Sequence, residues 1–220
     1  YDLWALVQNG PEAELNQTDK TQPAMLAAGI AVWRCWESVS DDKPAYLAGH
    51  SLGEYTALVA AGALDFKTAI KLVEKRGQFM QQAVPAGEGA MAAILGLDDD
   101  TVKAVCEQAS DAGIVEAVNF NSPGQVVIAG SKSAVDKAVM MASEKGAKRA
   151  LLLPVSVPSH CALMRPAAEK LSAELESVSI QTPNIPVIHN TSVTSTSDPD
   201  QIRQLLAQQL YNPVRWVETV

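Results

Sequence analysis

The chain has 220 residues, of which 47% are hydrophobic, 19% charged and 5% aromatic. This apolar fraction can bury a core and excludes a disordered or fibrous protein, while the length fits one large domain, alone or with a smaller insert. Lys and Arg total 17 against 25 Asp and Glu, which gives a formal charge of -8 and excludes a general nucleic-acid binder.

The three cysteines, Cys35, Cys106 and Cys161, form no CxxC pair. This spacing excludes a disulfide framework and a cysteine zinc site, and it indicates reduced thiols. The sequence has neither an apolar run of about 20 residues nor a signal-peptide pattern. We therefore expect a soluble cytoplasmic protein with no membrane contact and no metal or other cofactor.

The first part of the sequence has the apolar spacing and end signals of helices, interrupted by one short apolar run. The predicted elements are helix 1–8 closed by Gly10, a single turn at 11–15, helix 23–36 with Thr21 as N-cap, strand 44–49, helix 52–61 closed by Gly62, and helix 66–82 capped by Asp65. The apolar run is too short for a helix, which indicates a buried strand. A strand, a sharp turn and a helix therefore follow one another at 44–61.

A different order begins after Pro85 and Gly87. The pattern predicts strand 90–97, helix 99–109, strands 114–120 and 125–129, helix 131–145 and strand 149–155. This β-α-β-β-α-β order is that of the ferredoxin-like split motif. We therefore predict an inserted small subdomain at residues 87–156.

The remaining sequence returns to the α/β pattern. It predicts a helix from 162 or 166 to 175, strand 186–189, helix 199–210 and a further helix with Asn212 as N-cap. Residues 1–86 and 157–220 then form an incomplete large α/β subdomain, whose other strands must lie outside the chain. Tyr1 is not a methionine and no C-cap precedes Val220, so we expect a fragment lacking both ends.

Gly49-His50-Ser51-Leu52-Gly53 fits the G-x-S-x-G nucleophile elbow, with an apolar strand before it and a helix after it. We expect both glycines to be needed because side chains would collide in so sharp a turn. Ser51 then projects near a helix N-terminus, whose free N–H groups and dipole favour an oxyanion. The alternative is an ordinary strand-to-helix turn with a serine cap.

A nucleophilic serine needs a base, and the chain has three histidines. His50 is adjacent to Ser51 and should point away from it. His189 ends a predicted buried strand and is interpreted as a packed or hydrogen-bonded side chain. His160 follows the last strand of the small subdomain, and we predict it as the base, with an ordinary loop histidine as the alternative. No carboxylate stands out as a third member of a triad.

Arg76 lies on the apolar face of the predicted helix 66–82. At about 100° per residue it falls among apolar positions that include Met80, and the opposite face carries Lys67, Lys71 and Lys75. A buried guanidinium is costly unless an anion receives it. We therefore predict that Arg76 binds the second carboxylate of an acyl group bidentately, with a structural ion pair or a snorkelling side chain as alternatives. The lysines form a solvated helix face or meet an acidic partner.

Four separated segments together resemble the malonyl-CoA:acyl carrier protein transacylases of bacterial fatty acid synthesis. They are 49–55, 74–77, 119–125 and 158–160, and the similarity runs the whole length of the chain. The resemblance implies an α/β-hydrolase-like large subdomain, with Ser51 as nucleophile, His160 as base and Arg76 as carboxylate ligand. It also implies that the backbone carbonyl of Gln209 orients the histidine and that the N–H of Leu52 is one oxyanion donor.

Further residues are weaker candidates for substrate binding. Asn121 can line the cleft, although Asn-Ser-Pro-Gly also forms a good hairpin turn, which is the favoured interpretation. Gln22 can contact the substrate or simply begin a helix, and Met80 shares the apolar helix face with Arg76. Cys161 adjoins the histidine but has no base of its own, which indicates a buried or bystander thiol.

We therefore expect an acyltransferase. Ser51 takes malonyl from coenzyme A as an acyl-serine and passes it to the phosphopantetheine thiol of acyl carrier protein, and the enzyme is expected to be a monomer. A serine esterase or thioesterase is one alternative, which Arg76 and the insert disfavour because a second subdomain can exclude water. A second alternative is an inactive binding module if the chain is truly truncated, since the family's Gly-Gln-Gly loop, which gives the other oxyanion N–H, and its Gly-Pro-Gly segment are absent from these residues.

Overall fold

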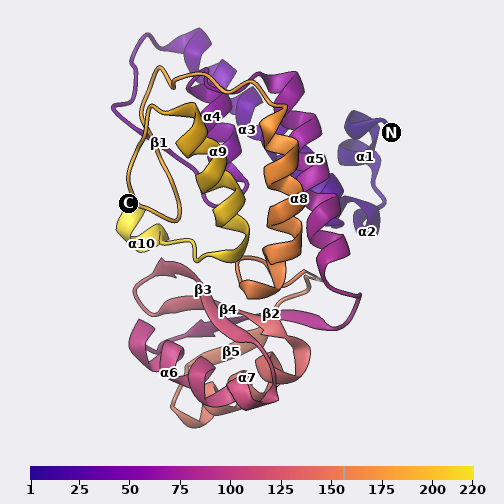
Figure 1. Ribbon diagram of the computed structural model, residues 1–220, viewed down its shortest axis with the longest axis vertical. Helices are drawn as coiled ribbons and strands as arrows, with labels where there is room; N and C mark the ends of the chain where they lie inside the picture. Colours follow the sequence, from indigo (N-terminus) through magenta and orange to yellow (C-terminus); the bar gives the residue numbers. More distant parts are fainter. Residues whose placement is uncertain (156) are drawn as a thin grey trace. The chain divides into compact units, whose positions relative to one another are not determined.

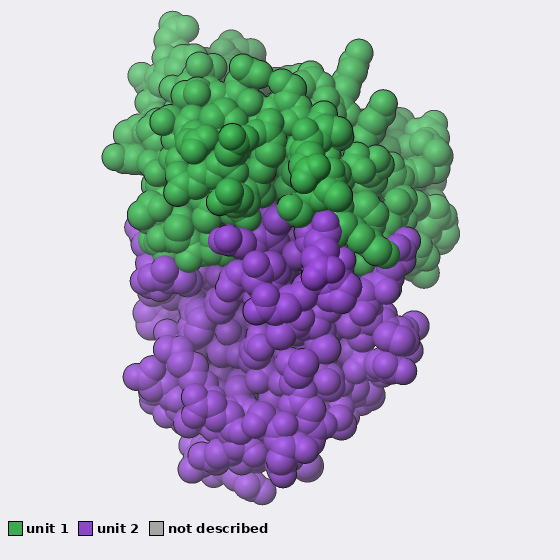
Figure 2. Space-filling model, in the orientation of Figure 1, with its two compact units in different colours: residues 1–79, 170–206 green, residues 80–169, 207–220 purple. Residues whose placement is uncertain are grey.

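The computed structural model describes residues 1–155 and 157–220. Ser156, the last residue of the predicted small subdomain, lies outside the described residues. The chain forms two compact units, which are coloured separately in Figure 2. Unit 1 comprises residues 1–79 and 170–206, and unit 2 comprises residues 80–169 and 207–220.

Unit 1 is mainly helical. Its elements are α1 (Leu3–Asn9), α2 (Glu12–Leu15), α3 (Thr18–Val39), β1 (Leu47–Ala48), α4 (Gly53–Ala60), most of α5 (Phe66–Ala83), much of α8 (Arg165–Glu176), β6 (Val187–Ile188) and most of α9 (Pro199–Gln208). None of the described helices is both long and apolar enough to cross a membrane.

The small sheet of unit 1 pairs β1 with β6 in parallel, with Leu47 opposite Val187 and Ala48 opposite Ile188. The predicted buried strand 44–49 is thus two residues long, and it is half-buried to exposed rather than buried. The prediction was wrong on burial. In the described sheet β1 pairs with β6 along one edge, so the other edge of β1 has no neighbouring strand to cover it. The strand predicted at 186–189 is likewise shorter, although Val187 is fully buried.

The start of α3 also differs from the prediction. The helix begins at Thr18 with Gln17 as N-cap, and the Thr21 hydroxyl donates to the Leu15 carbonyl at 2.5 Å instead of capping. Pro23 lies inside the helix, whereas the sequence rule that places proline in a first turn put the start too late. The cap predicted for α5 is confirmed, because Asp65 Oδ2 accepts from the Thr68 amide at 2.9 Å.

Unit 2 contains a four-stranded antiparallel sheet in the order β3-β4-β2-β5. Its elements are β2 (Gly89–Leu95), α6 (Asp99–Ala109), β3 (Val115–Ser122), β4 (Gln125–Ser131), α7 (Lys132–Glu144) and β5 (Arg149–Leu152), with a 3-10 turn at Ser110–Ala112. This is the β-α-β-β-α-β order that the sequence predicts, and α6 and α7 cover one face of the sheet (Figure 1).

The two faces of this sheet bury different sets of side chains. Ala92, Ile94 and Ile128 pack under the two helices, together with residues of α6 and α7. The opposite face buries a smaller group made of Met91, Val118, Val127, Ala129 and Cys161. The segment after β5 is therefore fixed to the face of the sheet that the helices leave open.

The end of the chain is also part of unit 2 and packs against its sheet. The 3-10 turn η3 (Gln209–Tyr211) is followed by Val214, which bonds to β3 through the amide of Phe120 at 3.0 Å and the carbonyl of Val118 at 2.8 Å. The predicted N-cap at Asn212 is wrong, because this pairing keeps the chain extended and α10 (Trp216–Thr219) has Arg215 as its N-cap. Unit 2 therefore includes residues beyond the predicted subdomain 87–156.

Candidate active site

The predicted elbow lies in unit 1 between β1 and α4. Ser51 has a φ of +52°, a left-handed backbone conformation that residues other than glycine seldom adopt. A Cβ on Gly49 would lie 2.0 Å from the Gly53 carbonyl, so this position requires glycine. A Cβ on Gly53 would meet nothing within 4 Å, so the expectation that both glycines prevent a collision is wrong for Gly53. That residue opens α4, where a Cβ points into open space.

Leu52 is the N-cap residue of α4. Backbone N–H groups at the start of a helix have no acceptor within the helix, and they carry the positive end of its dipole. The next two amides are used locally, since Gly53 N–H donates to the His50 carbonyl at 2.9 Å and Glu54 N–H to the Ser51 carbonyl at 3.1 Å. The Leu52 amide, which precedes these two, remains the candidate oxyanion donor beside Ser51.

Arg76 is among the largest fully buried side chains of the described residues, with 1% of its surface exposed. Its Nη2 donates to Ser51 Oγ at 3.2 Å, and its Nη1 donates to Gln22 Oε1 at 2.6 Å. The helical-wheel prediction that Arg76 is buried is confirmed. The structure brings the buried guanidinium and the candidate nucleophile into contact within unit 1.

Gln22 and Tyr55 surround this guanidinium. The Gln22 side chain is buried and bridges Arg76 to the Thr18 hydroxyl, which accepts from Nε2 at 3.0 Å. The Tyr55 ring centre lies 5.5 Å from the guanidinium carbon. Burial lowers the pKa of Arg76 and raises the pKa of Tyr55. Arginine nevertheless keeps its charge in proteins, so the site holds a desolvated cation beside a serine hydroxyl.

Met80 and Asn121 lie in unit 2. Met80 is one turn beyond Arg76 along α5 and is 3% exposed. Asn121 is half-buried near the end of β3, directly before the β3–β4 hairpin. Pro123 and Gly124 form the tip of that hairpin, with a φ of +74° at Gly124, so the turn predicted at Asn-Ser-Pro-Gly is confirmed.

His160 lies in unit 2 and is 3% exposed. Its φ is +68°, its amide donates to the Leu210 carbonyl at 2.9 Å, and its Nδ1 lies 2.7 Å from the Gln209 carbonyl oxygen. A carbonyl can only accept, so in the neutral ring Nδ1 carries the hydrogen and Nε2 is left as the proton acceptor. The Gln209 contact therefore selects the tautomer that a general base needs.

The residues after His160 are also fixed. The Ala162 amide donates to Glu116 Oε2 of β3 at 3.1 Å. The Cys161 thiol is fully buried and donates to the Pro158 carbonyl at 3.2 Å, and burial raises its pKa to about 12. Cys161 is therefore a buried thiol, as predicted from the sequence.

His189 and two residues that the sequence analysis missed lie beneath Ser51. His189 is fully buried with Nδ1 at 2.7 Å from Glu54 Oε1, which confirms the interpretation of a hydrogen-bonded histidine. Glu54 and Asn190 complete this group, and Asn190 Oδ1 accepts from the Ser51 amide at 2.6 Å. The available signal for Glu54 was a carboxylate on an otherwise apolar helix, GEYTALVA. Asn190 gave no local signal.

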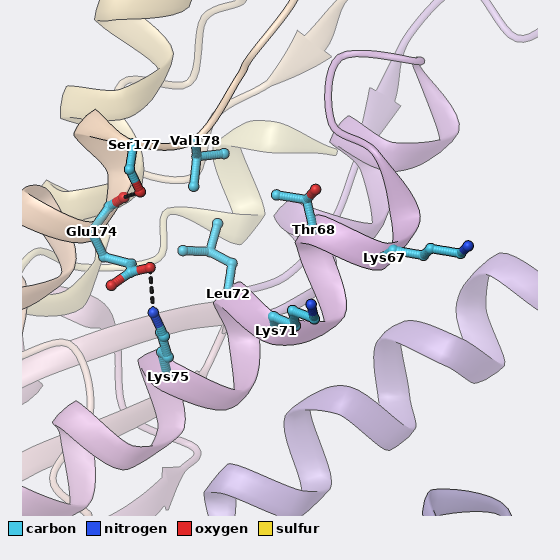
Figure 3. Close-up of a pocket in the computed structure, with 8 residues that line it drawn as sticks. All are labelled: Lys67, Thr68, Lys71, Leu72, Lys75, Glu174, Ser177 and Val178. Carbon is cyan, nitrogen blue, oxygen red and sulfur yellow. Dashed lines mark hydrogen bonds and ion pairs between the residues drawn. The ribbon is translucent and has the colours of Figure 1, made fainter.

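The lysine face of α5 lines a separate pocket of ≈ 230 Å³ in unit 1, shown in Figure 3. Lys75 Nζ points toward Glu174 of α8 and pairs with its Oε1 at 2.5 Å, whereas Lys67 points away from that carboxylate. All three lysines of this face are exposed, as expected for a solvated helix face. Within residues 1–155 and 157–220, no cluster of three or more His, Cys, Asp or Glu side chains could hold a metal ion.

Known proteins resemble this chain over its whole length. The acyl transferase domain family matches residues 1–220. The malonyl CoA-acyl carrier protein transacylase of Haemophilus influenzae is 60% identical over 221 residues, covering 100% of this chain and 71% of that protein. The transacylase of the same name from Escherichia coli K12 is 57% identical over 220 residues, with the same two coverages.

Solved structures of these enzymes have the same fold. The transacylase of Coxiella burnetii superposes with a TM-score of 0.98 at 55% identity, covering 100% of this chain and 69% of that one. A structure of PlMCAT, a malonyl-transacylase in complex with a type II PKS acyl-carrier protein, has a TM-score of 0.98 at 57% identity and covers 100% and 71% of the two chains. The chain therefore belongs to the acyl transferase family, in its malonyl CoA-acyl carrier protein transacylase branch.

Proposed function

We propose that this protein moves a malonyl group from coenzyme A to acyl carrier protein in fatty acid biosynthesis, by way of a malonyl ester of Ser51. The observation that carries the proposal is the 3.2 Å contact between Arg76 Nη2 and Ser51 Oγ at a buried position. A hydrolase acting on a simple acyl ester has no need of a buried cation there. An acyl group that ends in a second carboxylate does.

In the first half-reaction, His160 Nε2 takes the proton of Ser51 Oγ as the oxygen attacks the thioester carbonyl of malonyl-CoA. The tetrahedral intermediate then collapses, the C–S bond breaks, and His160 returns the proton to the leaving thiolate of coenzyme A. The second half-reaction is the reverse with a different thiol. The phosphopantetheine thiol of acyl carrier protein loses its proton to His160 and attacks the acyl carbon of the malonyl-serine. The bond from that carbon to Ser51 Oγ then breaks, His160 returns the proton to Oγ, and the malonyl thioester of the carrier is released.

Each remaining candidate residue has a role in this scheme. Arg76 receives the free malonyl carboxylate through its planar fork, and Gln22 holds the guanidinium in place. The Leu52 amide stabilises the oxyanion of the tetrahedral intermediate. The Gln209 carbonyl orients His160. Met80 and Asn121 line the substrate site.

We propose an α/β-hydrolase-like large subdomain for the finer fold, with an inserted ferredoxin-like subdomain at residues 87–156. The strand-turn-helix arrangement around Ser51 supports the first assignment, and the strand order β3-β4-β2-β5 supports the second. The partners are malonyl-CoA and acyl carrier protein, and the complex between PlMCAT and its acyl-carrier protein supports the second of these. The predicted cytoplasmic location and monomeric state complete the proposal.

Mass spectrometry of the intact protein mixed with malonyl-CoA tests this function. We expect a stable malonyl adduct that disappears when acyl carrier protein is added, with malonyl-carrier as the product. Rapid release of free malonate would instead indicate a thioesterase, and an unchanged mass would indicate a binding module. The Ser51→Ala variant should form no adduct, and a persistent adduct would place the nucleophile elsewhere.

A further inference from the structure

Three polar side chains are buried beneath Ser51. Glu54 is 1% exposed, and His189 and Asn190 are 0% exposed. Glu54 lies in the first turn of α4, whereas His189 and Asn190 directly follow β6. Because β1 and β6 are parallel neighbours, the residues after β6 lie beside the turn that follows β1.

The Asn190 carboxamide bonds to the backbone on both sides of His50. Its Oδ1 accepts from the Ser51 amide at 2.6 Å, and its Nδ2 donates to the Gly49 carbonyl at 2.8 Å. An amide needs an acceptor and a carbonyl needs a donor, so one orientation of the carboxamide satisfies both groups. A single side chain therefore holds the backbone of the elbow at two points.

Glu54 in turn fixes Asn190. Its Oε2 accepts from the backbone amide of Asn190 at 3.0 Å, and its Oε1 is bonded to His189 Nδ1 at 2.7 Å. The Glu54 amide donates to the Ser51 carbonyl at 3.1 Å, which closes the chain of contacts on the elbow itself. His189 is also held by its backbone, since its amide donates to the Thr194 carbonyl at 3.1 Å.

This arrangement has a cost that packing alone does not explain. Burying a carboxylate is unfavourable unless hydrogen bonds satisfy it, and an apolar side chain would fill the same space without that cost. The left-handed backbone of Ser51 is also a strained conformation that surrounding contacts must maintain. Both observations have one explanation if the network exists to hold Ser51 in this conformation.

We propose that Asn190 is a positioning residue for the reaction and that Glu54 is its anchor. Asn190 acts through the backbone of Ser51 and thereby sets the direction of Oγ and of the Leu52 amide that follows. The Ser51 amide itself donates to Asn190, so the network leaves the oxyanion to other donors. This inference rests on the proposed role of Ser51 as the nucleophile.

The chemistry of the carboxamide defines the test. The Asn190→Asp variant keeps the size and can accept from the Ser51 amide, but a carboxylate cannot donate to the Gly49 carbonyl. The Asn190→Ala variant makes neither bond. We expect the rate of malonyl-enzyme formation at saturating malonyl-CoA to fall by about 10²-fold in Asn190→Ala and by less in Asn190→Asp, with KM changed by less than about threefold, because orientation rather than binding is lost.

A matched control separates positioning from general stability. Leu206 in α9 is fully buried in unit 1, and the Leu206→Ala variant should lower the urea midpoint without slowing acylation in the folded protein. Rates are measured by quenched-flow mass spectrometry on variants that remain folded. If Asn190→Ala does not fold, Asn190→Asp gives the same readout.

The outcomes are distinguishable. A kcat loss with unchanged KM in the Asn190 variants, absent in Leu206→Ala, supports the positioning role. Acylation within about threefold of wild type in the folded Asn190 variants overturns it, and so does a loss that Leu206→Ala reproduces at equal stability. An adduct that survives in Ser51→Ala overturns the proposed function instead, whatever the Asn190 variants do.

Discussion

Ser51 and His160 have the same unusual backbone conformation, with φ values of +52° and +68°, but different contacts maintain it. The elbow in unit 1 is held by side chains, above all the Asn190 carboxamide. The histidine in unit 2 is held by backbone carbonyls, those of Gln209 and Leu210. The proposed nucleophile therefore depends on the identity of particular distant residues, whereas the proposed base depends on the path of the chain.

The chemistry of the two groups explains the difference. His160 needs one acceptor for its Nδ1–H so that Nε2 stays basic. Every residue type supplies a backbone carbonyl at position 209, so this acceptor does not depend on the side chain there. The elbow must provide partners for the Ser51 amide and the Gly49 carbonyl, in a turn too tight for either to bond to a neighbouring strand. A carboxamide offers a donor and an acceptor on one side chain. Substitution can remove that contact, but it cannot remove the Gln209 carbonyl.

The largest loss of activity is expected when His160, whose position the backbone fixes, is removed. The His160→Ala variant should slow malonyl-enzyme formation by about 10²–10⁴-fold, the range for loss of a general base. Quenched-flow mass spectrometry measures that rate, and circular dichroism checks that the variant remains folded. A loss below about tenfold would mean that another group deprotonates Ser51, and the comparison between a side-chain-held nucleophile and a backbone-held base would fail.

A second, smaller effect concerns substrate choice by Arg76, which lies beside Ser51 in unit 1. Removing the guanidinium in Arg76→Ala leaves the site without its cation and deletes a charge-assisted pair worth about 1.5–3 kcal/mol. We therefore expect the ratio of malonyl to acetyl transfer to fall by roughly 10- to 150-fold, because 1.4 kcal/mol corresponds to about a factor of ten. Both transfer rates are measured from the two acyl-CoAs under the same conditions.

The matched control for this prediction is Arg76→Lys. A point charge cannot reproduce the planar fork, so it should recover only part of the malonyl preference. The melting temperature of each variant is measured alongside. An unchanged malonyl-to-acetyl ratio with a lower melting temperature would show that Arg76 is structural, and the side chains around Ser51 would then serve the fold alone.

Local patterns were sufficient to predict most elements and several site residues. Periodicity and capping residues predicted α5, α6 and α7, and the G-x-S-x-G spacing predicted the turn at Ser51. The same reasoning placed Arg76 on a buried face, because burial of a helical residue follows from the spacing of its neighbours. These features depend on residues a few positions apart.

The remaining features depend on contacts between distant parts of the chain. Asn190 is 139 positions from Ser51, and neither residue has a neighbour that reveals the bond. The pairing of Val214 with β3 overrode a good N-cap signal at Asn212. The burial of β1 was overestimated because an apolar run does not show how many strands flank it. Local sequence therefore located the candidate nucleophile but not the residues that hold it.

A third prediction compares the two kinds of support directly. The Gln209→Ala variant keeps the carbonyl that accepts from His160 Nδ1, so acylation should slow by less than about tenfold, well below the loss in His160→Ala. The Asn190→Ala variant removes the contact to Ser51 and should slow acylation more. Rates are compared well below the unfolding temperature of each variant, since Gln209 is buried. A loss in Gln209→Ala equal to that of His160→Ala would assign the orienting role to the side chain.

The smallest expected effect concerns the thiol beside the base. Burial raises the pKa of Cys161 to about 12, and the same cause raises the pKa of Cys106 to about 12. Near pH 8, iodoacetamide should therefore modify the exposed Cys35 in the folded protein and leave both buried thiols unmodified. Peptide mass spectrometry identifies the modified residues, and labelling in urea provides the control in which all three react.

The same pKa shifts predict how stability changes in alkali. An unfolded thiol loses its proton near pH 8.5, whereas the folded Cys161 keeps its proton up to about pH 12. The contribution of the protonated Cys161 thiol to the free energy of unfolding is therefore fully present below about pH 8.5. It falls as the pH rises from there towards about 12, because the unfolded state then binds fewer protons than the folded state. The urea midpoint should fall less between about pH 8 and pH 10 in Cys161→Ala than in wild type, since the variant lacks this proton. Equal falls would mean that Cys161 ionises in the folded state, and a thiolate next to His160 would then compete with Ser51 for the acyl group.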